Sequence, residues 1–92
     1  MTIEELHNKL VELQIPEERY YLHGLYGSPD DNDKIALTIR KGKYTIEYET
    51  YFKERGEKHS SMIFFNEDEA CEYVLNRLVK EQAFWNSRRK NS

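Results

Sequence analysis

Two neighbouring runs of alternating side chains constrain the fold of this chain more than any other feature. In "KIALTIR", residues 34–40, Ile35, Leu37 and Ile39 alternate with smaller or polar side chains. The run "YTIEYETYF", residues 44–52, alternates in the same way. One side carries Tyr44, Ile46, Tyr48 and Phe52, and the other carries Thr45, Glu47, Glu49 and Tyr51. Gly42 in the intervening "KGK" predicts a tight turn, so the two runs predict a β-hairpin.

An amphipathic helix is expected at each end of the chain. Thr2 and Glu5 have the spacing of a capping box, and a stripe of apolar residues follows. The stripe consists of Ile3, Leu6, Leu10 and Leu13. Pro16 predicts that this helix ends near Gln14. Asn66 predicts the start of the second helix, with acids in its first turn. Its expected apolar face is Ala70, Cys71, Val74, Leu75, Leu78 and Val79, continued by Phe84 and Trp85.

The segments between the helices predict a small sheet. "RYYLHGLYG", residues 19–27, is interpreted as one strand, and "GSPDDND", residues 27–33, as an acidic loop. Gly56 in "KERGEK" predicts a second turn that leads into the last strand, "HSSMIFF". The fold class is therefore α+β, with an antiparallel sheet of three to four strands and both helices on one face. We expect a single domain over residues 1–85 and a polar, basic tail over residues 86–92.

The distribution of charge argues against nucleic-acid binding. The net charge is −3, and three of the 14 basic residues are Arg88, Arg89 and Lys90 in the tail, which leaves 11 bases against 17 acids. A body this acidic repels phosphate backbones and attracts basic partners. The order of helix, strands and helix is also that of a double-stranded-RNA-binding domain. Such domains place bases at the start of the second helix, whereas this chain has "NEDEACE" there.

Residues with catalytic or metal-binding chemistry are few. Cys71 as a nucleophile needs a lowered pKa, but it lies on the apolar stripe beside three acids, so we interpret it as a small buried hydrophobe. His7, His23 and His59 do not share metal-ligand spacing, so no metal and no cofactor are expected. We expect His7 on the polar side of the first helix. His23 as a general base has no evident partner.

The terminal sequence and the single cysteine bear on where the protein acts. The N-terminus carries acids where a signal peptide needs bases, and no window approaches the roughly 20 apolar residues that span a bilayer. One cysteine cannot form an internal disulfide, which agrees with a reducing compartment. We therefore expect a cytoplasmic protein without a membrane partner.

An acidic surface that carries tyrosine is the main candidate for a functional site. Carboxylates steer a basic partner, and tyrosine supplies contact area. Glu47, Glu49 and Tyr51 are expected on the open face of the sheet, with Glu54 and Arg55 at the following turn. The loop acids Asp30, Asp31 and Asp33 are expected as a second contact.

The run "YFKERGEKHSSMIFFNEDEACEYVLNRL", together with "IPEERYYLHGLYG" upstream, resembles immunity proteins. These are small bacterial proteins encoded beside polymorphic or contact-dependent toxins, and the resemblance extends from about Ile15 to Leu78. It implies a non-enzyme that binds and blocks one toxin domain, in many cases a nuclease with a basic groove. Relatives often have Trp in the central strand, where this chain has Tyr44.

Two other functions stay open from the sequence. One is a small enzyme or ligand-binding domain that uses His23, Glu54 and Cys71. The other is a regulatory module that self-associates through the open face of the sheet. The oligomeric state expected with an immunity function is a monomer or a weak homodimer.

Overall fold

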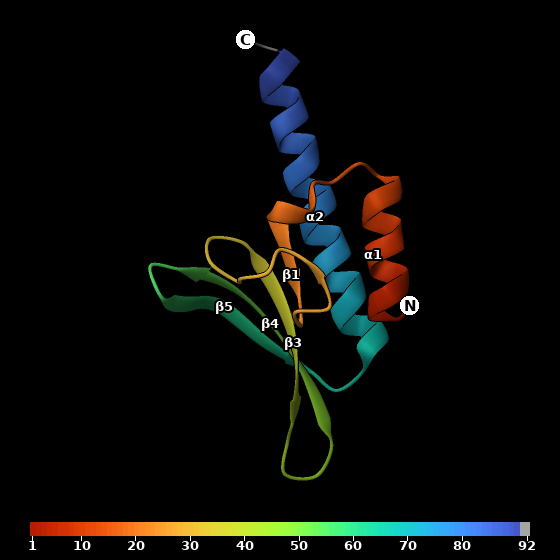
Figure 1. Cartoon of the computed structure of the whole chain (residues 1–92), viewed down its shortest axis with the longest axis vertical. Coiled ribbons are helices and arrows are strands. Elements are labelled where there is room, and N and C mark those ends of the chain that lie inside the picture. Colours follow the sequence, from red (N-terminus) through yellow and green to blue (C-terminus); the bar gives the residue numbers. More distant parts are fainter. Residues whose placement is uncertain (91–92) are drawn as a thin grey trace.

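The computed structural model describes the backbone of residues 1–90 and side chains as far as residue 86. The elements follow one another as α1 (Ile3–Glu12), the 3-10 helix η1 (Glu17–Arg19), β1 (Tyr20–Leu22), β2 (Tyr26–Gly27), β3 (Ile35–Lys41), β4 (Ile46–Glu54), β5 (Glu57–Phe64) and α2 (Glu67–Lys90). The two helices lie side by side on one face of the sheet, and both begin at the same end of the molecule (Figure 1). The α+β class with both helices on one face is therefore confirmed.

The predicted capping box of α1 is present. The Thr2 hydroxyl accepts a hydrogen bond from the Glu5 N–H at 3.1 Å, and the Glu5 carboxylate accepts one from the Thr2 N–H at 2.9 Å. Glu67, in the first turn of α2, accepts a hydrogen bond from the Ile3 N–H at 3.0 Å. This contact joins the two helix N-termini and fixes α1 against α2.

The end of α1 lies two residues before the predicted position. The helix ends at Glu12, because Gln14 adopts a left-handed conformation with φ of 59°. The Ile15 N–H then donates to the Leu10 carbonyl at 3.0 Å, which is the Schellman arrangement of a helix C-terminus. The reversal buries Ile15 beside Leu10 and leaves Leu13 exposed, so the prediction that Leu13 belongs to the apolar stripe was wrong.

The sheet is mixed, and the described residues form five strands in the order β2-β1-β3-β4-β5. β1 pairs parallel with β3, and the other pairs are antiparallel. The prediction of three to four strands, all antiparallel, was wrong because "RYYLHGLYG" is not one strand. His23 and Gly24 have φ of 52° and 72°, so the chain reverses between β1 and β2. A loop over residues 28–34 then returns the chain to the other side of β1, where β3 begins parallel to it.

The β3–β4 hairpin is confirmed, with a register that runs from Ile35 opposite Phe52 to Lys41 opposite Ile46. The connecting turn is longer than predicted. The Gly42 N–H donates to the Thr45 carbonyl at 2.8 Å, so β4 begins at Ile46. Tyr44, expected on the core face of a strand, lies in this turn with 88% of its surface exposed.

The turn between β4 and β5 is the predicted one at Gly56. Arg55 and Gly56 have φ of 53° and 80°, as a two-residue turn of type I′ requires, and Glu54 lies directly opposite Glu57. The β4–β5 register shifts between Thr50 and Phe52, where Ser60 has φ of 54° and forms a bulge in β5.

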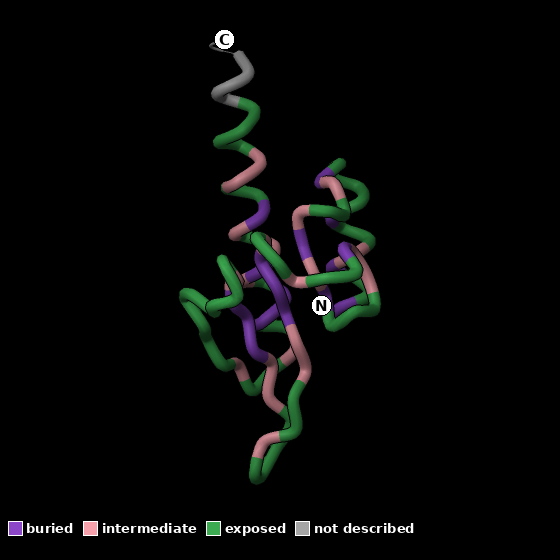
Figure 2. The backbone as a smooth tube through the Cα atoms, turned by 60° about the vertical axis from the view of Figure 1, so that its left-hand side comes forward, coloured by how far each residue is buried: buried purple, intermediate pink, exposed green. Residues whose placement is uncertain are grey.

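The core lies between the helices and one face of the sheet. The Asn66 side chain caps α2 by accepting from the Glu69 N–H at 3.2 Å, as predicted. The buried cluster comprises Ile3, Leu6, Leu10, Ile15, Tyr20, Leu22, Ile35, Leu37, Ala70, Cys71, Val74 and Leu78. Figure 2 shows these buried residues at the centre of the molecule and exposed residues at the hairpin ends.

The C-terminal half of α2 departs from the predicted apolar face. Val79, Phe84 and Trp85 are exposed, although Leu78 beside Val79 is buried. The C-terminal end of α2 extends beyond the sheet (Figure 1). Arg19 lies over the Trp85 ring at 5.7 Å and donates a hydrogen bond to Gln82. The helix continues through Lys90, so the backbone of residues 86–90 is helical, while the basic side chains expected in the tail lie outside the described residues.

Thr50 offers a simple way to stabilise this fold. Its side chain is fully buried in β4, and its hydroxyl has no hydrogen-bond partner among the described residues. A buried hydroxyl without a partner costs about 1–3 kcal/mol, so Thr50→Val is expected to raise the free energy of unfolding by about 1 kcal/mol. Urea denaturation followed by circular dichroism measures this change. Thr45→Val, at an exposed position, is the control, and a loss of stability in Thr50→Val would contradict the prediction.

Candidate functional site

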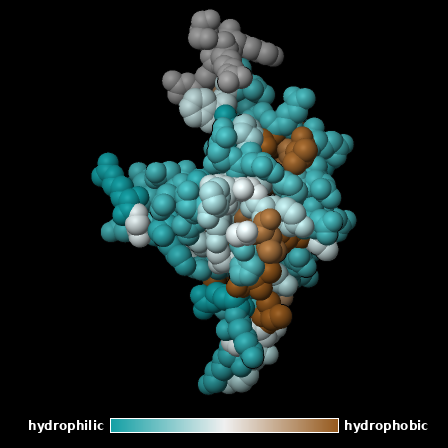
Figure 3. Space-filling model, viewed as in Figure 1, coloured by the Kyte–Doolittle hydropathy of each residue, from teal (hydrophilic) through white to brown (hydrophobic). Residues whose placement is uncertain are grey.

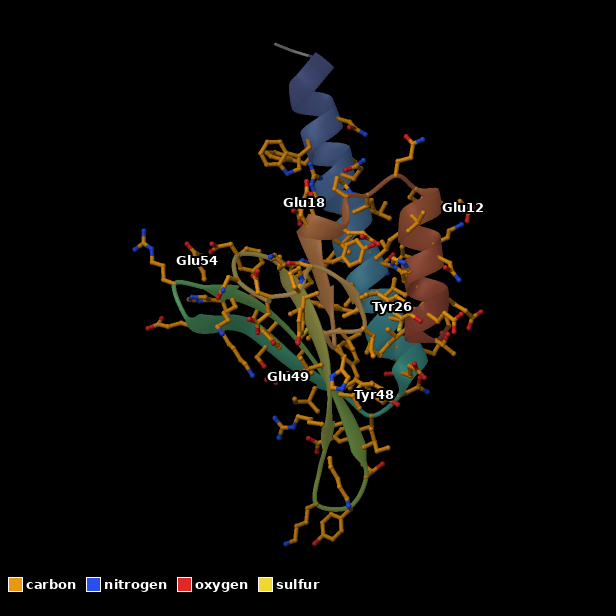
Figure 4. The ribbon with its side chains drawn as sticks, viewed as in Figure 1. Glu12, Glu18, Tyr26, Tyr48, Glu49 and Glu54 are labelled. Atoms are coloured by element: carbon orange, nitrogen blue, oxygen red, sulfur yellow. The ribbon has the colours of Figure 1, made fainter. Side chains whose placement is uncertain are left out.

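The residues predicted to bind a partner do not form one exposed surface. Glu47, Glu49 and Tyr51 do share the sheet face opposite the helices, as predicted. In Figure 4, however, Glu49 lies near the middle of the sheet, whereas Glu54 lies at the end of a projecting hairpin. The structure therefore separates the predicted site into a covered part and an exposed part.

Tyr51 is covered by the loop over residues 28–34. Only 3% of its surface is exposed, and its hydroxyl donates to the Asp31 carboxylate at 2.6 Å. Lys53 lies 3.4 Å from the same carboxylate, and the Asp33 N–H donates to the Lys53 carbonyl at 2.6 Å. The Tyr51 hydrogen bond holds the pKa of Asp31 below its ordinary value, and burial together with Asp31 raises the pKa of Tyr51. The expectation that Tyr51 faces water or a partner was therefore wrong.

Glu49 is also satisfied inside the protein, with 8% of its surface exposed. Its carboxylate accepts from Ser61 at 2.7 Å and from Lys58 at 3.0 Å. Burial alone would raise the pKa of Glu49, but these two hydrogen bonds hold it below its ordinary value. Lys58 also lies 4.5 Å from the centre of the Tyr51 ring, so it covers both residues. Glu49 and Tyr51 are therefore parts of an internal polar network, and the expected open acidic face is absent at these two positions.

Two further predicted acids have cations of their own. Glu47 is half-buried and pairs with Arg40 at 2.9 Å. Asp30 accepts from the Asn32 N–H at 3.0 Å and from Lys34 at 3.1 Å, and these contacts lower its pKa. Both carboxylates therefore already have a cation beside them.

The remaining predicted residues meet at the β4–β5 turn. Glu54, Arg55, Glu57 and His59 line a hollow of about 340 Å³, and all four are exposed. Asp33 is exposed as well, and its backbone bond to Lys53 places it beside the base of this turn. Asp33, Glu54, Arg55 and Glu57 are called the acidic tip below. Among the described residues, none of its three carboxylates forms an ion pair.

His23, Glu54 and Cys71, the residues considered for an enzyme or ligand-binding site, do not lie together. Cys71 is fully buried, and burial, reinforced by the nearby charge of Glu67, raises the pKa of its thiol to about 12. Its interpretation as a buried hydrophobe is confirmed. His23 accepts a hydrogen bond from the Ile39 N–H at 3.0 Å, and the hollow beside Glu54 is lined by neither His23 nor Cys71.

The contacts that His7 makes beneath α1 were not predicted from the sequence. The His7 ring stacks on Tyr26 at 4.5 Å, and its Nδ1 lies 3.3 Å from the Tyr20 hydroxyl. Its Nε2 lies 3.6 Å from the Glu17 carboxylate. The expectation that His7 lies on the polar side of α1 was wrong. Helical spacing from Ile3 already places it at the border of the apolar stripe, which is the signal that could have indicated its burial.

The described residues contain neither a metal-binding cluster nor a membrane-spanning helix. Among the described side chains, as far as residue 86, no three from His, Cys, Asp or Glu are grouped so that they could hold a metal ion. Neither α1 nor the described length of α2 is long and apolar enough to cross a lipid bilayer. Comparisons with protein-family models, curated proteins and solved structures found no match to this chain.

Proposed function

We propose that this protein is a non-catalytic binding module of the immunity type, which neutralises a bacterial toxin domain by docking its acidic tip against a basic surface. The observation that carries the proposal is the position of Glu54 directly opposite Glu57 in the β4–β5 ladder. Like charges directly opposite each other destabilise an antiparallel pair. The next pair of the ladder, Lys53 opposite Lys58, is also of like charge, but these lysines pair with Asp31 and Glu49. Glu54 and Glu57 have no ion pair among the described residues, and a cationic partner surface would supply one.

The surroundings of the tip support the same function. The hairpin projects away from the helices (Figure 1), and its end is hydrophilic in Figure 3. Asp33 adds a third carboxylate beside it. The excess of acids over bases in the body steers a basic partner toward the chain, and such steering weakens as the ionic strength rises. The sequence resemblance to immunity proteins supplies the class of partner.

The partner is identified first by capture. The purified chain is immobilised and exposed to a lysate of the source organism, and the proteins that stay bound are identified by mass spectrometry. Capture of one tightly bound protein with a basic, toxin-like domain supports the proposal. Its purified domain then serves as the probe in the next experiment.

Charge reversal at the tip separates binding from folding. Glu57→Lys is expected to weaken binding of the captured domain about tenfold or more, chiefly through slower association. The same change places opposite charges across from each other, so the free energy of unfolding should rise by about 0.5 kcal/mol. Surface plasmon resonance and urea denaturation measure the two effects.

Glu18→Lys is the matched control, because it changes the net charge equally at an exposed position in η1, away from the tip (Figure 4). It should bind nearly as well as the unchanged chain. Equal losses in the two variants would show a general effect of net charge and would remove the acidic tip from the proposal. Unchanged binding in Glu57→Lys would do the same.

A further inference from the structure

The two edges of the sheet differ in how they are protected. The β2 edge is two residues long, contacts α1 and η1, and carries Tyr26, on which His7 stacks. The β5 edge is eight residues long, and all of its residues except Phe64 are exposed. Proteins usually shorten or cover an edge strand, because its free N–H and C=O groups pair readily with another strand. Of the two outer strands in the described part of the chain, β5 is therefore the longer and the more exposed.

Protection within β5 is confined to its first half. Lys58 and the bulge at Ser60 are features that discourage pairing with another strand. The second half, residues 61–64, has no charged residue and no proline, and residues 62–64 pair regularly with β4. Its Ile63 is 39% exposed, and Phe65 immediately after the strand is 67% exposed. Residues 61–64 therefore present a regular and partly apolar edge.

Charge at the two ends of this edge selects the kind of strand that fits. Glu54 and Glu57 lie at one end, and the acidic first turn of α2, residues 67–69, lies at the other. In that turn Asp68 pairs with the N-terminal ammonium group and Glu67 accepts from the Ile3 N–H, whereas Glu69 forms no ion pair among the described residues. In a second copy paired antiparallel through β5, the acidic turn end of one strand would lie beside the acidic α2 end of the other. Like charges would then meet at both ends of the pair. An extended segment with apolar residues in its middle and lysine or arginine at both ends meets opposite charge at each end.

We infer that the edge formed by residues 61–64 binds such a basic-ended, extended segment of the partner protein as an added β-strand. Main-chain hydrogen bonds hold the added strand, and contacts with Met62 on one face and Ile63 on the other select apolar side chains. The inference rests on the proposed function, because it names the part of the partner that docks beside the acidic tip.

The probe is a synthetic ten-residue peptide with an alternating Thr-Val centre and two lysines at each end. It is titrated into the isotope-labelled full chain, and amide chemical shifts and hydrogen exchange are followed by NMR. We expect saturable shifts centred on residues 61–64 and slower exchange of their outward-facing amides. A peptide with glutamate in place of every lysine should have an affinity at least about tenfold lower.

Ile63→Lys should abolish binding of the lysine peptide, since a charged side chain on an edge strand opposes pairing. Val79→Lys is the matched control, because Val79 is an exposed β-branched residue on α2, and it should bind as the unchanged chain does. Shifts centred elsewhere, no saturable binding, or a concentration-dependent dimer through β5 would overturn the inference. The protein-binding function could survive that result, because it is judged separately by Glu57→Lys with the captured domain.

Discussion

Replacement of Gly27 by alanine is expected to lower the free energy of unfolding by about 3 kcal/mol. Gly27 has φ of 84°, a conformation that disfavours any residue with a Cβ. A Cβ there would also lie 2.5 Å from the Tyr20 carbonyl oxygen and 2.7 Å from a carbon of the Tyr20 ring. Tyr20 is fully buried, so its ring cannot move aside. The melting temperature should fall by about 15 °C in a domain of this size.

Gly56→Ala separates the two causes of this loss. Gly56 has nearly the same φ, 80°, but a Cβ there would meet no atom within 4 Å. This variant bears only the conformational cost, about 1 kcal/mol. Thermal unfolding of both variants, followed by circular dichroism, gives the comparison. Equal losses would show that the close approach to Tyr20 contributes nothing, which would contradict the packing argument.

The parts of the fold that depend on neighbouring residues could be predicted from the sequence. The capping box at Thr2, the cap at Asn66 and the turn at Gly56 each involve residues within three positions of one another. The β3–β4 hairpin follows from alternation within two adjacent runs. In each case the interaction is local, so a short stretch of sequence contains both partners.

The mixed sheet could not be predicted, because it depends on conformations that the residue types do not indicate. His23 adopts a positive φ although it is not glycine, and it reverses the chain at a position where alternation appeared to continue. The parallel pairing of β1 with β3 follows from the loop over residues 28–34, whose path depends on contacts with β4.

The candidate site was predictable only in part for the same reason. Acidic composition drew attention to Glu54, which the structure leaves exposed, but the covering of Tyr51 requires Asp31, which is 20 positions away. Alternation places a side chain on one face of a sheet, and it does not indicate which loop crosses that face. Exposure at the tip comes from the projection of the hairpin, which is a property of the folded chain.

Truncation of Tyr20 to alanine is expected to have the largest effect of any single change considered for this protein. Among the described residues, Tyr20 is the largest fully buried side chain, and it lies where β1 meets α1 and Gly27. Loss of a buried aromatic side chain leaves a cavity and costs about 4 kcal/mol. A domain of this length has about 5–14 kcal/mol of stability in total, so Tyr20→Ala should remove a large share of it.

Tyr20→Phe distinguishes packing from hydrogen bonding at this position. It keeps the ring and removes only the hydroxyl that lies 3.3 Å from His7 Nδ1, so it should cost about 1 kcal/mol. Urea denaturation of both variants measures the two losses. A loss in Tyr20→Phe close to that in Tyr20→Ala would mean that the His7 cluster, and not the ring, holds β1 against α1. A small loss in Tyr20→Phe with a large one in Tyr20→Ala assigns this role to the ring. The sheet edge opposite β5 would then be stabilised mainly by apolar packing.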